Sequence, residues 1–340
     1  MNLKRLPLAV VGLVAAAACS TATAGSTDQA GGAQSGYPVT ISNCGKDYTF
    51  QKAPSRVVVM NGGSVAEVSA LLELGLGDKV VANAQSYGAS EVDGRVEAIK
   101  KLPTGDIKLN DLYDIPREAM IGLNPDFVIS TYDGGFRAEA GFATRDDLAA
   151  IGANTYAPAS SCGAVGTVGG KPSIEDSYAL LRDLGKVFGV SAKAEQVIAD
   201  AEKRVEAVEA KTAKLAKQNA MLIIPGMAMG GEFSSVGGNG IWNDIFAKAG
   251  AVNAFEGATQ DLFANLSAEQ VAKADVDVLV VVNYMSADPK ADAQKLFDRF
   301  PQWDAAKNKR FVVLSDSVYL GPSNHLAVEA IAKAAHPGAL

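Results

Sequence analysis

The stretch EAMIGLNPDFVIS, residues 118–130, and the stretch EQVAKADVDVLVV, residues 269–281, carry the same pattern. Each begins with a glutamate and has an aspartate eight residues later, Asp126 in the first and Asp277 in the second. Apolar residues between the two acids fall at helical spacing, and the apolar run after the aspartate suits a buried strand. Each copy therefore predicts a short helix that leads into a strand, and two copies predict two similar lobes.

Strands and helices alternate on both sides of one long helical stretch. The expected strands are Arg56–Met60, Val80–Ala82, Phe127–Thr131, Ala220–Ile224, Val278–Val282 and Phe311–Leu314. Such alternation is typical of βαβ units. The expected fold class is therefore α/β, with two lobes that each hold a mostly parallel sheet flanked by helices.

The long helical stretch, residues 191–218, lies between an N-terminal lobe of residues 37–190 and a C-terminal lobe of residues 219–340. At 1.5 Å per residue it would be about 40 Å long. That length favours one α-helix that joins the two lobes. A plain surface helix is the alternative, and alternating charges such as those of Glu202, Lys203 and Arg204 fit either.

The first 36 residues predict export and anchoring. Lys4 and Arg5 precede a short apolar run that is too short for a membrane-spanning helix, so residues 1–18 read as a signal peptide. Cys19 follows a run of alanines that includes Ala16, Ala17 and Ala18, as in a bacterial lipobox, which predicts lipidation of Cys19. Ordinary cleavage that leaves a free thiol is the alternative. The polar residues 19–36 then form a flexible tether, and the expected location is extracytoplasmic, on the cell membrane.

Composition bounds the function classes. A chain of 340 residues that is 48% hydrophobic has room for two well-packed domains. Removal of the signal peptide takes away two positive charges and changes the formal net charge from −7 to −9. This acidic balance, without any basic run, argues against a nucleic-acid partner.

Cys44 and Cys162 are the cysteines that remain in the mature domain. An even number of cysteines in an exported protein favours a disulfide. Closing a loop of this length would stabilise the fold by roughly 4–5 kcal/mol in the chain-entropy account. A metal site is the competing interpretation, but neither cysteine has a histidine or a second cysteine at ligand spacing, so no metal site is expected.

Catalysis fits the sequence poorly, and we expect no enzyme. The two histidines, His325 and His336, lie near the carboxyl end, and the motifs of hydrolases, nucleotide-binding loops and metalloproteases are missing from the sequence. A lipoprotein hydrolase would have to use Ser323, His325 and Asp316. The loop Gly237–Gly240 could hold an anion at a helix start, but it lacks a following Lys-Ser/Thr, which favours a tight turn.

A binding cleft fits better, because ligands of parallel α/β sheets sit beyond the carboxyl ends of the strands. Aromatic and scattered polar residues follow the predicted strands and suit a bulky, partly flat ligand. A core position is the alternative for any single tyrosine or methionine, and an exposed loop is the alternative for the arginine. The expected ligand-binding residues are Asn61, Gln85, Tyr87, Tyr132, Arg137, Met227, Phe233, Tyr284 and Tyr319.

The mature chain, residues 43–337, resembles a known family. The segments that carry the resemblance are Ala53–Val58, Leu74–Val81, Leu123–Ile129, Gly240–Trp242 and Ser267–Val271, which occur in the family's order and spacing. The chain resembles the helical-backbone class of substrate-binding proteins that serve ABC importers of ferric siderophores, haem and cobalamin. It is most similar to actinobacterial ferric-siderophore lipoproteins, which also place a cysteine pair like Cys44 and Cys162.

The resemblance implies a role for the two repeated glutamates. Glu118 and Glu269 occupy the motif positions where the family's glutamates engage arginines of the permease dimer. The alternative is a glutamate favoured at a helix start by the helix dipole, worth a few tenths of a kcal/mol. The second copy has Val276 where the first has Pro125, which weakens the local motif but not the predicted helix and strand.

The resemblance also implies the ligand class. We expect a monomer that captures a ferric siderophore, with iron present only inside the ligand and no separate cofactor. The scarcity of Lys and Arg after the predicted strands favours a neutral or cationic complex such as a ferric hydroxamate. Haem and cobalamin are the alternatives within the class, and a scaffold without a closable cleft is the alternative outside it.

Overall fold

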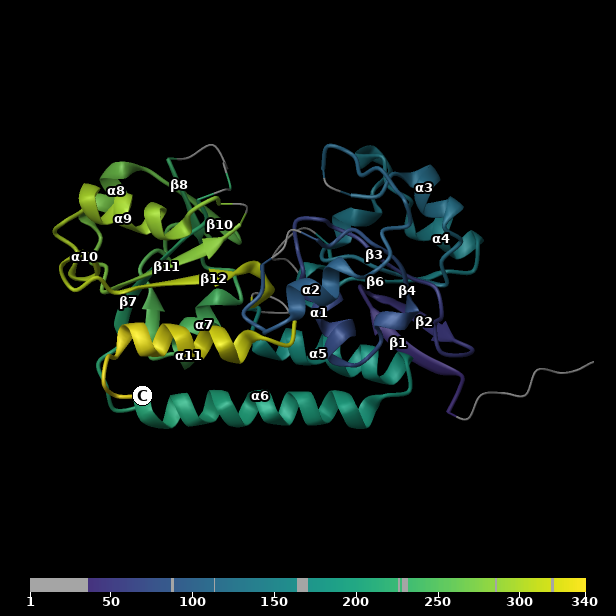
Figure 1. The fold of residues 1–340 in the computed structure, drawn as a ribbon, viewed down its shortest axis with the longest axis horizontal. Helices are drawn as coiled ribbons and strands as arrows, with labels where there is room; N and C mark the ends of the chain where they lie inside the picture. Colours follow the sequence, from purple (N-terminus) through teal and green to yellow (C-terminus); the bar gives the residue numbers. More distant parts are fainter. Residues whose placement is uncertain are drawn as a thin grey trace, which may run out of the picture.

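The computed structural model describes residues 36–86, 89–112, 114–163, 171–225, 227, 232–284, 286–318 and 321–340 (Figure 1). They form two α/β lobes side by side, with one long helix along their shared base. Among these residues, no helix is both long and apolar enough to cross a membrane. The predicted signal peptide, most of the tether and Cys19 lie outside the described residues.

The N-terminal lobe is built on a parallel four-stranded sheet with the order β4-β3-β5-β6. An antiparallel hairpin, β1 with β2, precedes it. The strands are β1 (Val39–Asn43), β2 (Lys46–Phe50), β3 (Val57–Val59), β4 (Val80–Asn83), β5 (Phe127–Ile129) and β6 (Asn154–Tyr156). The helices are α1 (Ala66–Glu73), α2 (Arg95–Lys100), α3 (Arg117–Gly122) and α4 (Arg145–Ala150).

The C-terminal lobe has a second parallel sheet with the order β12-β11-β7-β9 and a separate antiparallel pair, β8 with β10. Its strands are β7 (Gln218–Ile223), β8 (Phe233–Val236), β9 (Ala251–Asn253), β10 (Phe263–Leu266), β11 (Val278–Asn283) and β12 (Phe311–Ser315). Its helices are α7 (Trp242–Lys248), α8 (Ala268–Lys273), α9 (Pro289–Arg299), α10 (Asp304–Lys307) and α11 (Asn324–Ala335). The predicted α/β class with two parallel sheets is confirmed.

Two antiparallel helices connect the lobes: α5 (Ile174–Val187) and α6 (Ser191–Thr212). α6 runs along the whole base of the molecule and packs on α5 under one lobe and on α11 and α7 under the other (Figure 1). Its 22 residues make it about 33 Å long. One buried core runs from Phe127 through Val205 to Val280, so the lobes share packed interior as well as a connecting helix.

The joining helix is shorter than predicted, because it ends at Thr212 and not at Gln218. The Thr212 hydroxyl donates back to the carbonyl of Val208 at 3.2 Å and closes the last turn. Residues 213–217 then reverse the chain, and Gln218 begins β7 with its N–H on the carbonyl of Gly250. The residues of this segment have a high helix propensity, but the pairing of β7 in the sheet overrides it.

The two repeat copies occupy equivalent places in the two sheets. β5 and β11 are each flanked by two strands, and the aspartate before each ties down the start of a neighbouring strand. Asp126 accepts the N–H of Arg56 at 2.9 Å and donates its own N–H to the Arg56 carbonyl. Asp277 makes the same exchange with Asn219, at 2.8 Å in each direction. The repeated aspartate is therefore a structural residue.

The predicted disulfide is present. Cys44, after β1, and Cys162 are bonded across 118 positions, with their Cα atoms 5.1 Å apart. Arg145 of α4 lies beside it, with Nη2 3.5 Å from the Cys44 sulfur. The bond thus fastens the N-terminal hairpin to the chain that leads from β6 to α5.

Candidate functional site

A cavity of about 180 Å³ lies between the lobes, at the carboxyl ends of the parallel strands. Asn61 and Thr131 come from the segments that follow β3 and β5, while Val282 and Tyr284 come from the end of β11. The described residues that line it are Asn61, Gly63, Ser64, Thr131, Ile224, Met227, Trp242, Phe263, Val282 and Tyr284. Of the predicted ligand-binding residues, the structure brings Asn61, Met227 and Tyr284 together here.

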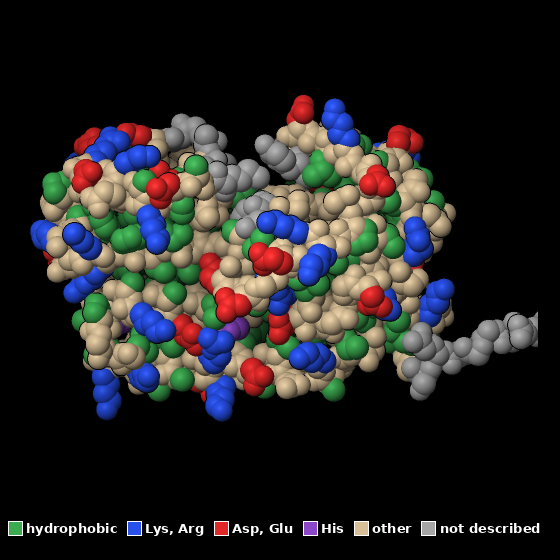
Figure 2. Space-filling view, in the orientation of Figure 1, with side chains coloured by type: hydrophobic (Ala, Val, Ile, Leu, Met, Phe, Trp, Pro, Cys, Tyr) green, Lys and Arg blue, Asp and Glu red, His purple; other side chains and the backbone are tan. Residues whose placement is uncertain are grey.

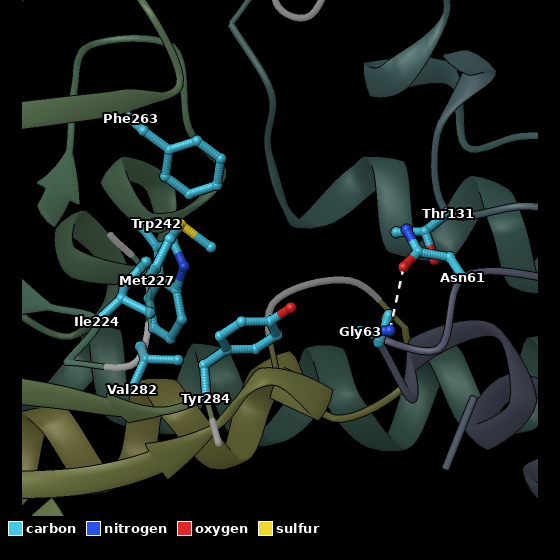
Figure 3. Close-up of a pocket in the computed structure, with 10 residues that line it drawn as sticks. Asn61, Gly63, Thr131, Ile224, Met227, Trp242, Phe263, Val282 and Tyr284 are labelled. Atoms are coloured by element: carbon cyan, nitrogen blue, oxygen red, sulfur yellow. Dashed lines mark hydrogen bonds between the residues drawn. The ribbon is translucent and has the colours of Figure 1, made fainter. Parts of the chain in front are cut away.

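The wall from the C-terminal lobe is apolar and aromatic. Trp242 is the first residue of α7, and its ring faces the cavity beside Met227 and Val282 (Figure 3). Tyr284 reaches from this wall toward the other lobe, with its hydroxyl near Gly63. A Cβ at Gly63 would lie 2.7 Å from that hydroxyl oxygen, so glycine is what allows the two lobes to approach here.

The wall from the N-terminal lobe is polar and uncharged at its surface. Asn61 has a left-handed backbone, with φ +70°, and its side-chain oxygen accepts the N–H of Gly63 at 3.2 Å. The Asn61 N–H donates to Asp114 at 3.0 Å, behind the wall. Burial raises the pKa of Asp114 to about 6, although the N–H groups of Asn61 and Ile115 oppose that rise. Asn61 is thus held by groups on both sides.

A buried network supports Thr131. The Thr131 hydroxyl donates to Glu67 Oε2 at 2.7 Å, and Gln85 donates to the same oxygen at 2.6 Å. Gln85 also accepts the N–H of Val68 at 3.0 Å and is fully buried. Burial raises the pKa of Glu67. The structure therefore places Gln85 behind the wall, as a support of Thr131, and not on the cavity surface.

Tyr132 and Arg137 lie close to each other in the N-terminal lobe, outside the cavity lining. They flank Gly134, where a Cβ would be 2.4 Å from Tyr132 Cε2 and 3.0 Å from Arg137 Nη2. Burial, with a smaller contribution from Asp114, raises the pKa of Tyr132, while Arg137 opposes that rise. Arg145 holds the short turn between them through an ion pair of 2.8 Å with Asp133.

Phe233 faces a second hollow, of about 330 Å³, within the C-terminal lobe. The Arg299 guanidinium lies 5.1 Å from the Phe233 ring centre and pairs with Glu232 at 2.5 Å. Met227 borders this hollow and the main cavity, so the two adjoin. Tyr87 and Tyr319, the two remaining predicted ligand residues, lie outside the described residues.

Several lining residues were missed from the sequence. Trp242 could have been found, because it opens a helix directly after a glycine-rich loop. Thr131 was treated as the end of a strand, although β5 ends at Ile129. Phe263 lies in β10, a four-residue strand that is too short to show an apolar period. The sequence could therefore have predicted Trp242 of the aromatic wall, but not Phe263.

Charged groups do not line the cavity within the described part of the chain. In the same part, no three His, Cys, Asp or Glu side chains gather as they would around a metal ion. Ser323 and His325 lie instead around a separate hollow beside α6. Burial lowers the pKa of His325 to about 4. His325 Nδ1 has no hydrogen-bond partner among the described residues, so Ser323 is not bonded to this ring nitrogen.

Glu118 and Glu269 occupy equivalent positions, each the second residue of its helix, α3 or α8. Both helices lie on the side of the molecule opposite α6 (Figure 1). The side chains are 86% and 77% exposed. Arg117 pairs with Glu118 at 2.8 Å, and Lys273 pairs with Glu269 at 2.6 Å. The two carboxylates thus stand on one outer face, one on each lobe.

Comparison with known proteins agrees with this geometry. A lipoprotein of Bacillus subtilis (strain 168), named an uncharacterized ABC transporter substrate-binding lipoprotein, is 23% identical over 305 residues, or 88% of this chain and 86% of that protein. The structure of an ABC-type Fe3+-hydroxamate transport system protein from Saccharomonospora viridis is 25% identical with a TM-score of 0.69, covering 88% of this chain and 99% of that one. A periplasmic heme-binding protein from Roseiflexus has the same fold, at 21% identity and a TM-score of 0.63, over 84% of this chain and 99% of its own.

The sequence profile of the Periplasmic binding protein family matches residues 57–318, which include both sheets, the joining helices and the cavity between them. The match covers well over half of the chain. The predicted helical-backbone architecture and the predicted lack of enzyme function are both confirmed. This chain therefore belongs to the periplasmic binding protein family, whose members bind substrates for transport and are not enzymes.

Proposed function

We propose that this protein captures an uncharged ferric hydroxamate siderophore between its lobes and delivers it to the permease of an ABC importer. The observation that carries the proposal is the cavity lining, in which an aromatic wall faces a polar wall and neither brings a charged side chain among the described residues. Three hydroxamates, each with one negative charge, neutralise Fe3+, so the complex needs no Lys or Arg for its capture. A buried charged site would instead favour a ligand of the opposite charge.

The two walls match the two surfaces of such a complex. Trp242 and Phe263 offer faces for the apolar arms of the chelate. Asn61 and Thr131 offer hydrogen-bonding groups for its amide and hydroxamate oxygens and N–H groups. A volume of 180 Å³ is below the roughly 300–1,000 Å³ of pockets that enclose whole drug-sized ligands. The ligand would therefore extend beyond the cavity, and Tyr132 and Arg137 are candidates for contacts outside its lining.

The comparisons support the transport role. The curated relative from Bacillus is named an ABC transporter substrate-binding lipoprotein, and the Saccharomonospora protein is described as part of an Fe3+-hydroxamate transport system. On this proposal Cys19 carries the lipid anchor at the extracytoplasmic side of the membrane, and the protein acts as a monomer. Glu118 and Glu269 then dock with positively charged residues of the permease dimer, one glutamate per half.

Haem is the second candidate ligand. The Met227 sulfur and the Tyr284 hydroxyl are both on the cavity, and each is a known type of haem iron ligand. A likeness to a heme-binding protein of Roseiflexus supports the fold, and on this reading one of the two residues would bind the iron. A bound haem would show a strong Soret band, which a ferric hydroxamate does not.

Fluorescence titration tests the proposal, because Trp242 lines the cavity while Trp303 is buried elsewhere. A ferric trihydroxamate should quench the emission with a Kd below about 1 μM. A ferric tricatecholate, haem and cobalamin should bind at least about a hundredfold more weakly. The Trp242→Phe variant gives the baseline. No response to any iron chelate, or tighter binding of the charged tricatecholate, would contradict the proposal.

A further inference from the structure

The carboxylate of Glu91 makes hydrogen bonds from one lobe to the other. Glu91 belongs to the N-terminal lobe, in the segment after β4, and it contacts Ser315 and Ser317 of the C-terminal lobe, 224 and 226 positions away. It accepts the N–H and the hydroxyl of Ser315 and, at 3.0 Å, the hydroxyl of Ser317. Both serines are buried. Charge-assisted hydrogen bonds of this kind are stronger than neutral ones.

The segment that carries Glu91 is itself fixed to the N-terminal lobe. Arg95, the first residue of α2, is buried and pairs with Glu73 of α1 at 2.5 Å. Its other guanidinium nitrogen donates to the carbonyl of Ser69, also in α1, and its N–H donates to Val92 at 3.1 Å. Glu91 is therefore held on a rigid support, so a pull on its carboxylate acts on the whole lobe.

The far side of this contact leads directly to the ligand cavity. Ser315 ends β12 and pairs in register with Asn283 at the end of β11. Tyr284 follows Asn283 and places its hydroxyl against Gly63 of the other lobe. Neighbouring strands lie about 4.8 Å apart. Glu91 therefore binds the end of β12, the strand next to β11, which leads into Tyr284.

The space behind the contact is hollow and not packed. A cavity of about 350 Å³ on the side of α6 is lined by Glu91, Glu73, Arg204 and His325, among other residues of both lobes. Figure 2 shows acidic, basic and histidine side chains around the gap between the lobes on this side. On the other side of the contact, residues 316–318 pack against α1, so the polar contacts of Glu91 add to that packing in fixing the distance between β12 and α2.

We propose that Glu91 is a positioning residue that pins the C-terminal sheet to the N-terminal lobe and so sets the width of the ligand cavity. Its three acceptor contacts hold the carboxyl end of β12, and through it the end of β11, at a fixed distance from Gly63. Loss of the carboxylate lets the lobes rock about α6. The inference requires only a two-lobed binding protein and holds whatever the ligand is.

Distance measurement between spin labels tests the inference without any ligand. Labels are attached at Glu118→Cys and Glu269→Cys, one on each lobe, with Cys19→Ser so that no other thiol is free while Cys44 and Cys162 stay bonded. Glu91→Ala should broaden the distance distribution. Glu97→Ala, which removes an exposed carboxylate from the same helix region, should leave it unchanged. An unchanged width in Glu91→Ala would overturn the proposal.

Two further variants separate positioning from general loss of stability. Ser317→Ala removes a single hydroxyl from the opposite lobe and should broaden the distribution less than Glu91→Ala. Glu91→Gln keeps one acceptor oxygen and should give an intermediate width. The dissociation rate of whichever chelate binds should rise about tenfold in Glu91→Ala, since loss of preorganisation acts mainly on dissociation. Faster dissociation with no broadening would show that Glu91 acts on the ligand and not on the lobes, which would also overturn the proposal.

Discussion

The two lobes have the same frame but present opposite chemistry to the cavity. Their parallel sheets place β5 and β11 in equivalent positions, and Asp126 and Asp277 fasten the neighbouring strands in the same way. The N-terminal lobe then offers amide and hydroxyl groups backed by buried carboxyls, whereas the C-terminal lobe offers Trp242 and apolar side chains. On the proposed function, the similar outer faces of the two lobes dock with one partner, and the different inner walls select the ligand.

The outer face gives the largest expected effect. The double variant Glu118→Arg with Glu269→Arg should reduce uptake to background, because charge reversal places like charges together at a cost of several kcal/mol. Ligand affinity should stay as in the wild type, since both glutamates lie outside the cavity. Radiolabelled iron uptake by cells measures the first, and fluorescence titration measures the second.

Glu118→Arg alone and Glu269→Arg alone should each reduce uptake by a similar amount if the outer faces of the two lobes are equivalent. Glu97→Arg with Glu206→Arg serves as the control, because both residues are exposed carboxylates outside α3 and α8, and Glu206 lies on α6 at the opposite side of the molecule. If uptake survives charge reversal at both Glu118 and Glu269, the two glutamates only stabilise the starts of their helices and do not dock with the permease.

The aromatic wall should dominate the affinity. Trp242→Ala removes a large ring from the cavity and should weaken ligand binding by about 3 kcal/mol, or roughly 150-fold. Trp242→Phe should recover most of that loss, because it keeps an aromatic face. Calorimetric titration checks both variants, and near-UV dichroism shows whether the core around Trp242 stays packed. If a folded Trp242→Ala protein bound the ligand with wild-type affinity, the aromatic wall would not contribute to binding.

The polar wall should make stability depend on pH through Asp114. Burial raises the pKa of Asp114 to about 6 in the folded protein, from an ordinary value of 3.8. The folded state therefore holds this proton more tightly than the unfolded state, and stability falls as the pH rises through this window. Asp114→Asn should be more stable than the wild type by about 3 kcal/mol at pH 7.5. Its advantage should vanish near pH 4, which urea unfolding at the two pH values would show.

The two repeated aspartates should differ in how much they stabilise their lobes. Asp126 accepts three hydrogen bonds, from the N–H of Arg56 and from the N–H and hydroxyl of Ser55, while Asp277 accepts one, from Asn219. At about 1 kcal/mol per bond, Asp126→Ala should lower the free energy of unfolding by roughly 2–3 kcal/mol and Asp277→Ala by about 1 kcal/mol. Equal losses in denaturant unfolding would mean that the two aspartates do not differ in this way.

Thr131 should have the smallest effect. Thr131→Val keeps the shape of the side chain and removes the hydroxyl that faces the cavity and donates to Glu67. Ligand affinity should fall by about 1 kcal/mol, or roughly fivefold, which is the net value of one hydrogen bond. A loss as large as that of Trp242→Ala would show that the polar wall carries the binding, and the contrast between the walls would then be reversed.

The frame was accessible from the sequence because it follows local rules. The Glu-to-Asp repeat, the apolar runs of β3, β7 and β11 and the even cysteine pair predicted two parallel sheets, a joining helix and a disulfide. The end of α6 was missed, because only the sheet that follows forces the chain to turn at Thr212. α9 was missed although Asp288 and Pro289 mark its start in the sequence.

The site was less accessible, because strand ends place residues near the cleft but do not orient them. Gln85 follows β4 as predicted, yet it turns inward to meet Glu67 because a buried carboxyl there needs a donor. Phe233 turns toward Arg299 and a neighbouring hollow. Glu91 gave no signal, since its partners Ser315 and Ser317 are more than 220 positions away and belong to the other lobe. Such contacts depend on how two complete lobes pack together.

Native mass spectrometry of the protein purified from its own cells, grown with little iron, would identify the bound ligand. We expect a bound species with the mass of one ferric hydroxamate complex, with no net charge of its own, and a broad visible band near that of other such chelates. Trp242→Ala purified in parallel should carry much less of it. A bound haem, a catecholate complex or a ligand without iron would contradict the account.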